Sequence, residues 1–223
     1  MIIDGKKEAA VLREAIKKEI TSLKDKTNRV PGLTVILIGD FAPSQIYVRN
    51  KEKNSKEVGI NSNVVKYATD VTEKEVLKKI KELNNDKEVS GILVQLPLPD
   101  QISKEKIINS IDPSKDVDGF SPVNVGNLAS GNHAIVPCTP LGCLLLLKKI
   151  EKNLSGKHAV IIGRSNLNGK PMAQLLLKEN CTVVITHSKT KNLKEECSKA
   201  DILIAAAGVA NLVKKDWVKD DSI

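Results

Sequence analysis

Short apolar runs typical of β-strands alternate with longer stretches of helical periodicity along most of this 223-residue chain. Strands separated by helices usually form parallel sheets, because each helix carries the chain back across a face of the sheet. The sequence therefore predicts an α/β fold. In the first half, the expected helices cover residues 6–26, 43–58 and 72–84, and the expected strands cover residues 33–38, 63–67 and 91–96.

Residues 112–143 are rich in Gly, Pro, Asn and Ser, which favours irregular loops between two units. We place the boundary near residue 120 and expect domains of residues 1–120 and 121–223. The second domain reads as a helix followed by βαβαβ, the core of a Rossmann-type nucleotide-binding half. Such a domain usually has more than three strands, so we expect the C-terminal end to be missing. The expected helices are 141–150, 171–179 and 193–199, and the expected strands are 158–163, 181–186 and 201–207.

The composition limits the partners and the compartment. The net charge is +8, but only four of the 35 basic residues are arginine and five residues are aromatic. Scattered lysines are typical of a solvated surface and few rings are available for base stacking, so we expect no nucleic-acid partner. No apolar run is long enough to span a membrane and the start lacks a signal-peptide pattern, which predicts a cytoplasmic protein without membrane contact. The four cysteines have no metal-binding spacing, so no metal site is expected.

The turn after strand 158–163 has the small residues that a phosphate-binding loop needs. Such residues let backbone amides and the start of the next helix approach a phosphate. The usual G-x-G-x-x-G pattern is broken, because Ser165 takes the second glycine position after Gly163 and Gly169 comes one residue late. Cofactor binding and a purely structural turn are both compatible with this pattern.

The end of the next strand favours a particular cofactor. NAD-binding domains usually place an acid there, which accepts from the ribose 2′-hydroxyl. Residues 186–190 read THSKT and contain no acid. Hydroxyls and cations suit a 2′-phosphate, so the sequence predicts NADP, with Arg164 as a second cationic contact. An ordinary polar loop is the alternative.

In the first domain, Ser44, Tyr47 and Lys51 follow the spacing i, i+3, i+7, which puts them on one face of helix 43–58. A ring for stacking beside a lysine that can move protons suits catalysis, whereas an exposed lysine is the ordinary alternative.

Gln95 lies at the end of strand 91–96, where ligands of open α/β sheets bind; the alternative is that it simply caps that strand. Asp116 and Asp118 lie just before the domain boundary, where a cleft would open; a calcium-like turn is the alternative, but it lacks further oxygen ligands.

These motifs, in this order, resemble the bifunctional methylenetetrahydrofolate dehydrogenase/cyclohydrolase family over essentially the whole chain. The segments that carry the resemblance are DGK at 4–6, SQIYVRNK at 44–51, GILVQLPLP at 91–99, KDVDG at 115–119, PCTP at 137–140, GRS at 163–165, GKPM at 169–172 and HSKT at 187–190.

The resemblance implies two α/β domains flanking a cleft, with folate on the first and NADP on the second. Lys51 would transfer protons, Tyr47 would stack on the substrate, and Gln95 would hydrogen-bond near Lys51. Asp118 would anchor the pterin, and Ser44 would belong to the same substrate site. Contacts to the cofactor phosphates would come from Gly163, Arg164, Ser165 and Ser188.

The implied chemistry is NADP-dependent oxidation of 5,10-methylenetetrahydrofolate to the methenyl cation, followed by hydrolysis to 10-formyltetrahydrofolate. The resemblance also implies a cytoplasmic homodimer in one-carbon metabolism, including purine biosynthesis. Relatives carry another strand and a closing helix beyond this point, and Leu141 stands where they often have a basic or small residue. A truncated chain that is inactive or only binds nucleotide is therefore one alternative. An NAD-preferring enzyme with dehydrogenase activity alone is another.

Overall fold

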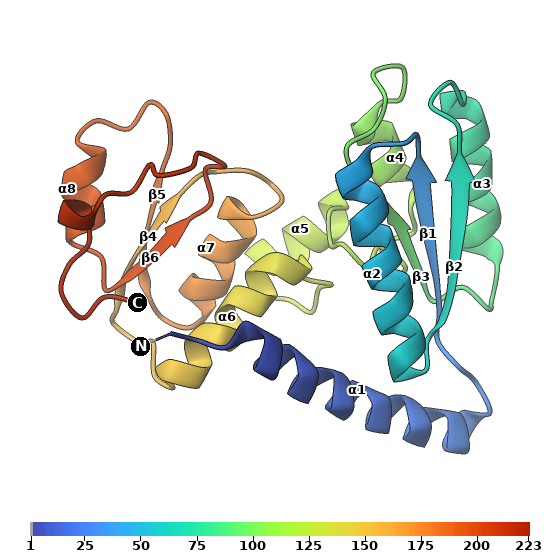
Figure 1. Cartoon of the computed structure of the whole chain (residues 1–223), viewed down its shortest axis with the longest axis horizontal. Helices are drawn as coiled ribbons and strands as arrows, with labels where there is room; N and C mark the ends of the chain where they lie inside the picture. The colour runs from blue at the N-terminus through green and yellow to red at the C-terminus, as the bar shows by residue number, and fades with distance from the viewer. Residues whose placement is uncertain (1) are drawn as a thin grey trace. The chain divides into compact units, whose positions relative to one another are not determined.

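The computed structural model describes residues 2–223, which form two compact units. One unit ends at Val117 and the other covers Asp118–Ile223. Each contains a three-stranded, all-parallel sheet with helices around it, as Figure 1 shows. The predicted α/β class, with parallel sheets in both halves, is confirmed.

The first unit has its strands in the order β2-β1-β3. Strand β1 lies in the middle and pairs Val35 with Val64 of β2 and with Leu93 of β3. The elements, in chain order, are α1 (Gly5–Thr27), β1 (Gly32–Ile38), α2 (Ala42–Val58), β2 (Asn61–Tyr67), α3 (Glu73–Asn85), β3 (Gly91–Val94) and α4 (Lys104–Ser110).

Alternate residues of β1 face opposite sides of the sheet, and different helices cover the two sides. Ile36 and Ile38 pack into a core with residues of α3 and α4. Val35 and Leu37 pack on the other side against Val48 of α2. Because both faces are buried, β1 reads as a continuous apolar run rather than an alternating one.

Helix α1 differs from the amphipathic helix that the sequence predicts. It forms over the expected range and contacts α2, with Arg13 Nε lying 3.7 Å from Glu57 Oε1. None of its described residues is buried, however, and Val11, Leu12 and Leu23 are 42–55% exposed. Its apolar stripe therefore contributes little to the described core.

The second unit has the strand order β5-β4-β6, so its central strand is also the first of its three in sequence. Ala159 and Ile161 of β4 pack against α6 and α7, while Val160 and Ile162 face Cys197 of α8. The elements are α5 (Pro122–Ala129), α6 (Cys138–Ile150), β4 (His158–Ile162), α7 (Gly169–Lys178), β5 (Thr182–Thr186), α8 (Leu193–Ser198), β6 (Ile202–Ala205) and the 3-10 helix η1 (Lys215–Trp217).

The prediction of irregular structure across residues 112–143 was wrong in part. Helix α5 lies inside this range, and α6 begins at Cys138 rather than at 141. Ser121 caps α5 by accepting from the Asn124 N–H, and a proline follows it in the first turn. These local start signals outweigh the loop-like composition. Helix α4 was also not predicted, and β3 ends at Val94 rather than at 96.

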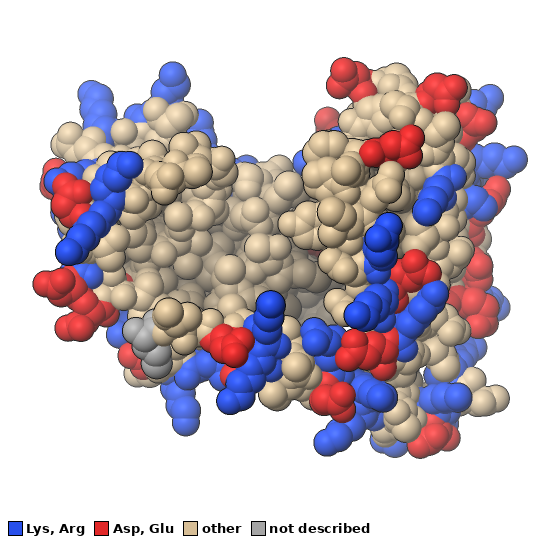
Figure 2. Space-filling view, viewed as in Figure 1, with Lys and Arg blue, Asp and Glu red and all other residues tan. Residues whose placement is uncertain are grey.

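Charge is distributed in small pairs. On the face shown in Figure 2, Lys and Arg are interspersed with Asp and Glu. Several lysines are paired with acids, as in Lys79–Glu82 and Lys106–Glu73. No helix among residues 2–223 combines the length and apolar character needed to cross a bilayer.

Candidate functional site

Helix α2 brings polar side chains to the carboxyl end of the first sheet. It has Pro43 in its first turn and ends at Gly59, whose φ of 93° is left-handed and therefore suits glycine. Ser44, Val48 and Ser55 are buried on the side that faces the sheet. Lys51 lies one helical turn from Val48 and is half-buried, whereas Tyr47 is 63% exposed.

Lys51 and Gln95 meet at this end of the sheet. Lys51 Nζ donates to Gln95 Oε1 at 3.2 Å. Gln95 follows β3 directly, and its backbone N–H donates to the Ile36 carbonyl of β1 at 2.9 Å. The sheet therefore fixes the backbone of Gln95, and α2 brings the lysine to it.

The Leu96 carbonyl determines which way the Gln95 amide points. It accepts from Gln95 Nε2 at 2.8 Å and from the Ser44 hydroxyl at 3.3 Å. Because the amide nitrogen faces Leu96, the amide oxygen faces Lys51. Ser44 is only 4% exposed, so it acts beneath the site by supporting Leu96.

The KDVDG segment is attached to the same unit through Lys115. Its ammonium donates to three carbonyls at the end of α3: Leu83 at 2.9 Å, Asn84 at 2.8 Å and Asp86 at 2.7 Å. Its own carbonyl accepts from the Ile92 N–H of β3 at 2.7 Å. No local sequence pattern could predict this role, because the partners lie about thirty positions away in the chain.

The residues of the segment after Lys115 are buried or half-buried. Asp116 is 2% exposed and forms an isolated parallel bridge with Ile92. Asp118 is half-buried and begins the second unit. Gly119 has φ of 68°, and a Cβ there would lie 2.3 Å from the Ile135 carbonyl oxygen. Glycine is therefore required immediately after Asp118.

In the second unit, the turn between β4 and α7 is tightly closed by two glycines. Gly163 has φ of 125°, and a Cβ there would lie 2.6 Å from the Ala206 oxygen. A Cβ on Gly169 would lie 2.1 Å from the Gly163 oxygen. Gly169 thus allows close packing of the helix against the strand. The third glycine of the usual pattern has the same role, although Gly169 comes one position later in the sequence.

The side chains around this turn fit a phosphate-bearing nucleotide. Ser165 Oγ accepts from the Asn168 N–H at 3.1 Å, which leaves its hydroxyl hydrogen available to a ligand. Arg164 and Ser188 are exposed, at the ends of the adjacent strands β4 and β5. Gly163 N–H also donates to the Thr186 oxygen at 2.9 Å, which ties the two strand ends together. Hydroxyl and guanidinium groups are donors that suit phosphate, and a glycine backbone without a Cβ lets a phosphate come close to them.

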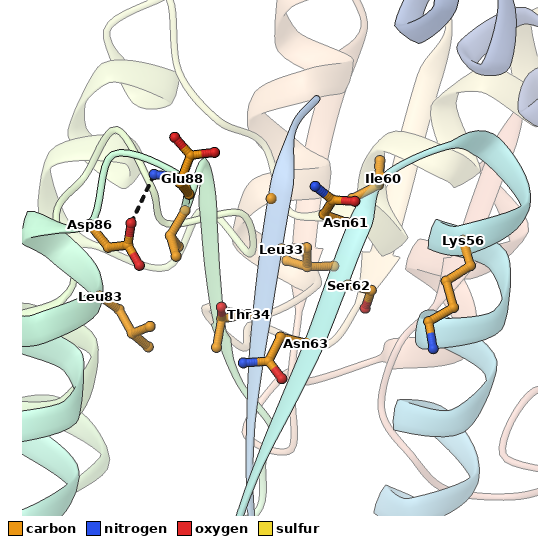
Figure 3. Close-up of a pocket in the computed structure, with 12 residues that line it drawn as sticks. Leu33, Thr34, Lys56, Ile60, Asn61, Ser62, Asn63, Leu83, Asp86 and Glu88 are labelled. Atoms are coloured by element: carbon orange, nitrogen blue, oxygen red, sulfur yellow. Dashed lines mark hydrogen bonds between the residues drawn. The ribbon is translucent and has the colours of Figure 1, made fainter. Parts of the chain in front are cut away.

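A further pocket lies at the opposite, amino end of the first sheet and has a volume of about 370 Å³ (Figure 3). Two of its three charged side chains, Lys56 and Asp86, have hydrogen-bond partners close by in the sequence. Lys56 donates to Glu52 at 2.7 Å, and Asp86 accepts from the Glu88 N–H at 2.9 Å. Residues 2–223 contain no cluster of His, Cys, Asp and Glu suited to a metal ion. The carboxyl ends of the sheets therefore remain the strongest candidate sites.

Comparison with known proteins covers both units. Residues 3–118 match the profile of the tetrahydrofolate dehydrogenase/cyclohydrolase catalytic domain, and residues 137–223 match its NAD(P)-binding domain. The chain is 67% identical over 223 residues to the bifunctional protein FolD of Pelagibacter ubique, covering all of this chain and 79% of that protein.

Solved structures agree with this. The bifunctional FolD dehydrogenase/cyclohydrolase of Campylobacter jejuni superposes with a TM-score of 0.96 at 48% identity, over 99% of this chain and 78% of that one. The Trypanosoma brucei enzyme, complexed with NADP cofactor and an inhibitor, gives a TM-score of 0.93 at 35% identity, over 98% and 75%.

Proposed function

The chain belongs to the tetrahydrofolate dehydrogenase/cyclohydrolase family, and from that premise we propose that it catalyses two consecutive reactions on one folate substrate. It oxidises 5,10-methylenetetrahydrofolate to the 5,10-methenyl cation with NADP, and it then hydrolyses that cation to 10-formyltetrahydrofolate. NADP, when bound, accepts the hydride that leaves the methylene carbon.

The observation that carries the proposal is the hydrogen bond from Lys51 Nζ to Gln95 Oε1. In the hydrolytic step, water adds to the cationic carbon and must lose a proton before a carbon–nitrogen bond of the ring opens. A neutral lysine amine can accept that proton, and a lysine can return a proton to the nitrogen that leaves. Gln95 holds the amine in place, and it adds no charge beside a cationic intermediate.

The remaining site residues have supporting roles in this proposal. Tyr47 is exposed one turn from Lys51, where its ring can stack on the folate. Asp118 would accept hydrogen bonds from the amino-pyrimidine edge of the pterin. Ser44, which the sequence suggested as a substrate contact, supports Leu96. The domains of residues 1–120 and 121–223 would hold folate and NADP respectively.

Binding of NADP is assigned to the two strand ends of the second unit. The pyrophosphate would pass close to the Gly163 backbone, whose N–H is bonded to Thr186, and would accept from the hydroxyl of Ser165. Arg164 and Ser188 would contact the 2′-phosphate. The close approach at Gly163 and Gly169 supports this assignment, because the turn leaves no side chain between backbone and ligand.

Substitution of Lys51 by methionine tests the function directly. Hydrolysis of 5,10-methenyltetrahydrofolate, followed by the loss of its absorbance, should fall by at least about a hundredfold, as expected for removal of a general acid–base group. Lys53→Met, on the exposed side of the same helix, should retain wild-type rates. Circular dichroism should show both variants folded. Equal hydrolysis by Lys51→Met and wild type would refute the proposed role.

Three finer features belong to the same proposal. Cys181 and Cys197 are buried, and burial raises the pKa of both thiols, which supports a packing role in the reducing cytoplasm.

Strand β5 is an uncharged edge strand on which Ile185 is 39% exposed, so a homodimer could cover it. The formyl product suits one-carbon donation, including purine biosynthesis. Light scattering during size-exclusion chromatography tests the dimer, and a monomer at micromolar concentration would contradict it.

A further inference from the structure

The turn after β5 is closed by its own side chains. The His187 N–H donates to Thr190 Oγ1 at 2.8 Å, and the Thr190 N–H donates to the His187 carbonyl at 2.8 Å. The Lys189 N–H donates to His187 Nδ1 at 3.1 Å. Three of the four backbone N–H groups of residues 187–190 are thus used within the turn.

This pattern determines what the turn can offer a ligand. His187 and Thr190 are half-buried, whereas Ser188 and Lys189 are exposed. The exposed side chains of the turn therefore offer a ligand the hydroxyl of Ser188 and the ammonium of Lys189. Nδ1 of His187 is used as an acceptor inside the turn.

We propose that His187 and Thr190 are positioning residues that set the preference for a ribose 2′-phosphate, and that Lys189 is a further cationic contact to it. The inference rests on the proposed use of NADP. The second strand of a nucleotide-binding βαβ unit ends beside the ribose 2′ position. A flexible turn would pay an entropic cost to bring a hydroxyl and a long lysine side chain to one phosphate, and the closed turn reduces that cost.

The test measures binding rather than turnover. Isothermal titration calorimetry with the full chain gives dissociation constants for 2′,5′-ADP and for 5′-AMP, which differ only in the 2′-phosphate. Wild type should prefer 2′,5′-ADP. In Thr190→Val, and in His187→Phe, which keeps a ring but removes Nδ1, that preference should fall by about five- to tenfold for the loss of one hydrogen bond.

Two controls separate positioning from general damage. Thr190→Ser retains the hydroxyl and should restore the wild-type preference. Thr182→Val makes the same substitution at the exposed amino end of β5 and should leave the preference unchanged. A general loss of stability would weaken the binding of both ligands equally and leave the ratio of their dissociation constants unaltered.

The outcomes distinguish the inference from the function on which it rests. If wild type prefers 2′,5′-ADP and both His187→Phe and Thr190→Val keep that preference, the positioning role is wrong while the use of NADP stands. If wild type shows no preference, the assignment of NADP itself is wrong. Replacement of Lys189 by methionine should also lower the preference. An unchanged ratio of dissociation constants would show that Lys189 does not contact the 2′-phosphate.

Discussion

At the level of single residues, the main-chain oxygen of Leu96 supports the hydrogen-bonded pair of Lys51 and Gln95. It accepts from Ser44 and from the Gln95 amide, and so it orients the group that holds Lys51. The resemblance to the family placed these residues in one site, whereas the sequence pattern alone put Ser44 and Lys51 on a helix face and Gln95 at a strand end. It could not reveal that Ser44 is buried, because helical spacing alone does not distinguish a residue beneath a site from one that faces the ligand.

Loss of the buried Ser44 hydroxyl should be measurable as a loss of stability. Ser44→Ala removes one donor to the Leu96 carbonyl, and a typical hydrogen bond contributes about 1 kcal/mol. Urea unfolding should show that decrease relative to Ser22→Ala, the same substitution on exposed α1. Equal unfolding free energies for the two variants would show that the hydroxyl adds nothing.

At the level of elements, a single lysine fixes the end of helix α3. The carbonyls at a helix C-terminus have no partner within the helix, and a cation there is favourable. Lys115 satisfies the carbonyls of Leu83 and Asn84, together with that of Asp86 just beyond the helix. The same residue continues into the segment that leads to Asp118.

Removal of this ammonium should destabilise the first unit. We expect Lys115→Met to lower the free energy of unfolding by about 1.5–3 kcal/mol, the usual range for hydrogen bonds to a charged group. Lys78→Met, on the exposed side of α3, is the matched control and should change it little. Chemical denaturation checks both, and similar values for the two variants would contradict the capping role.

The Asp201 carboxylate, just before β6, links the start of β4 to the segment after η1 and makes the stability of the second unit pH-dependent. The Lys219 ammonium and the His158 N–H both donate to Asp201, and they lower the pKa of its carboxyl. A lowered pKa in the folded state adds stability above the ordinary aspartate range, and that stability is lost as the pH falls through the lowered value.

Asp201→Asn should therefore destabilise the protein most at neutral pH. The difference from wild type should shrink as the solution is acidified below the ordinary aspartate range. Urea unfolding at a series of pH values measures this, with Asp25→Asn on exposed α1 as the control. A difference that stays constant or grows toward acid would contradict the assignment.

Elements with a strong hydrophobic periodicity could be predicted from the sequence, whereas elements marked only by a short local signal could not. Strand β1 and helix α3 follow from apolar runs and helical spacing, and Thr72 even provides the capping box that begins α3. Helix α5 was missed because its eight residues carry no long apolar period, and the Ser121 cap with the proline after it was the available signal. The closed turn at His187 could not be predicted, because sequence does not show which ring nitrogen accepts a hydrogen bond.

At the level of the whole molecule, two similar sheets have different tasks. Both are parallel and both place functional groups at their carboxyl ends. The first presents Lys51, suited to proton transfer, and the second presents a closed backbone turn at Gly163, suited to phosphate. In the proposed mechanism the nucleotide serves hydride transfer and Lys51 serves the proton transfers.

The most direct measurement is the absorbance of the methenyl product when the purified chain meets 5,10-methylenetetrahydrofolate with NADP or with NAD. We predict that methenyl forms faster with NADP and then decays by hydrolysis. No methenyl with either cofactor, from a folded sample, would contradict the proposed function and favour a chain that at most binds nucleotide. Formation with NAD alone and without decay would instead indicate a dehydrogenase that lacks the hydrolytic step.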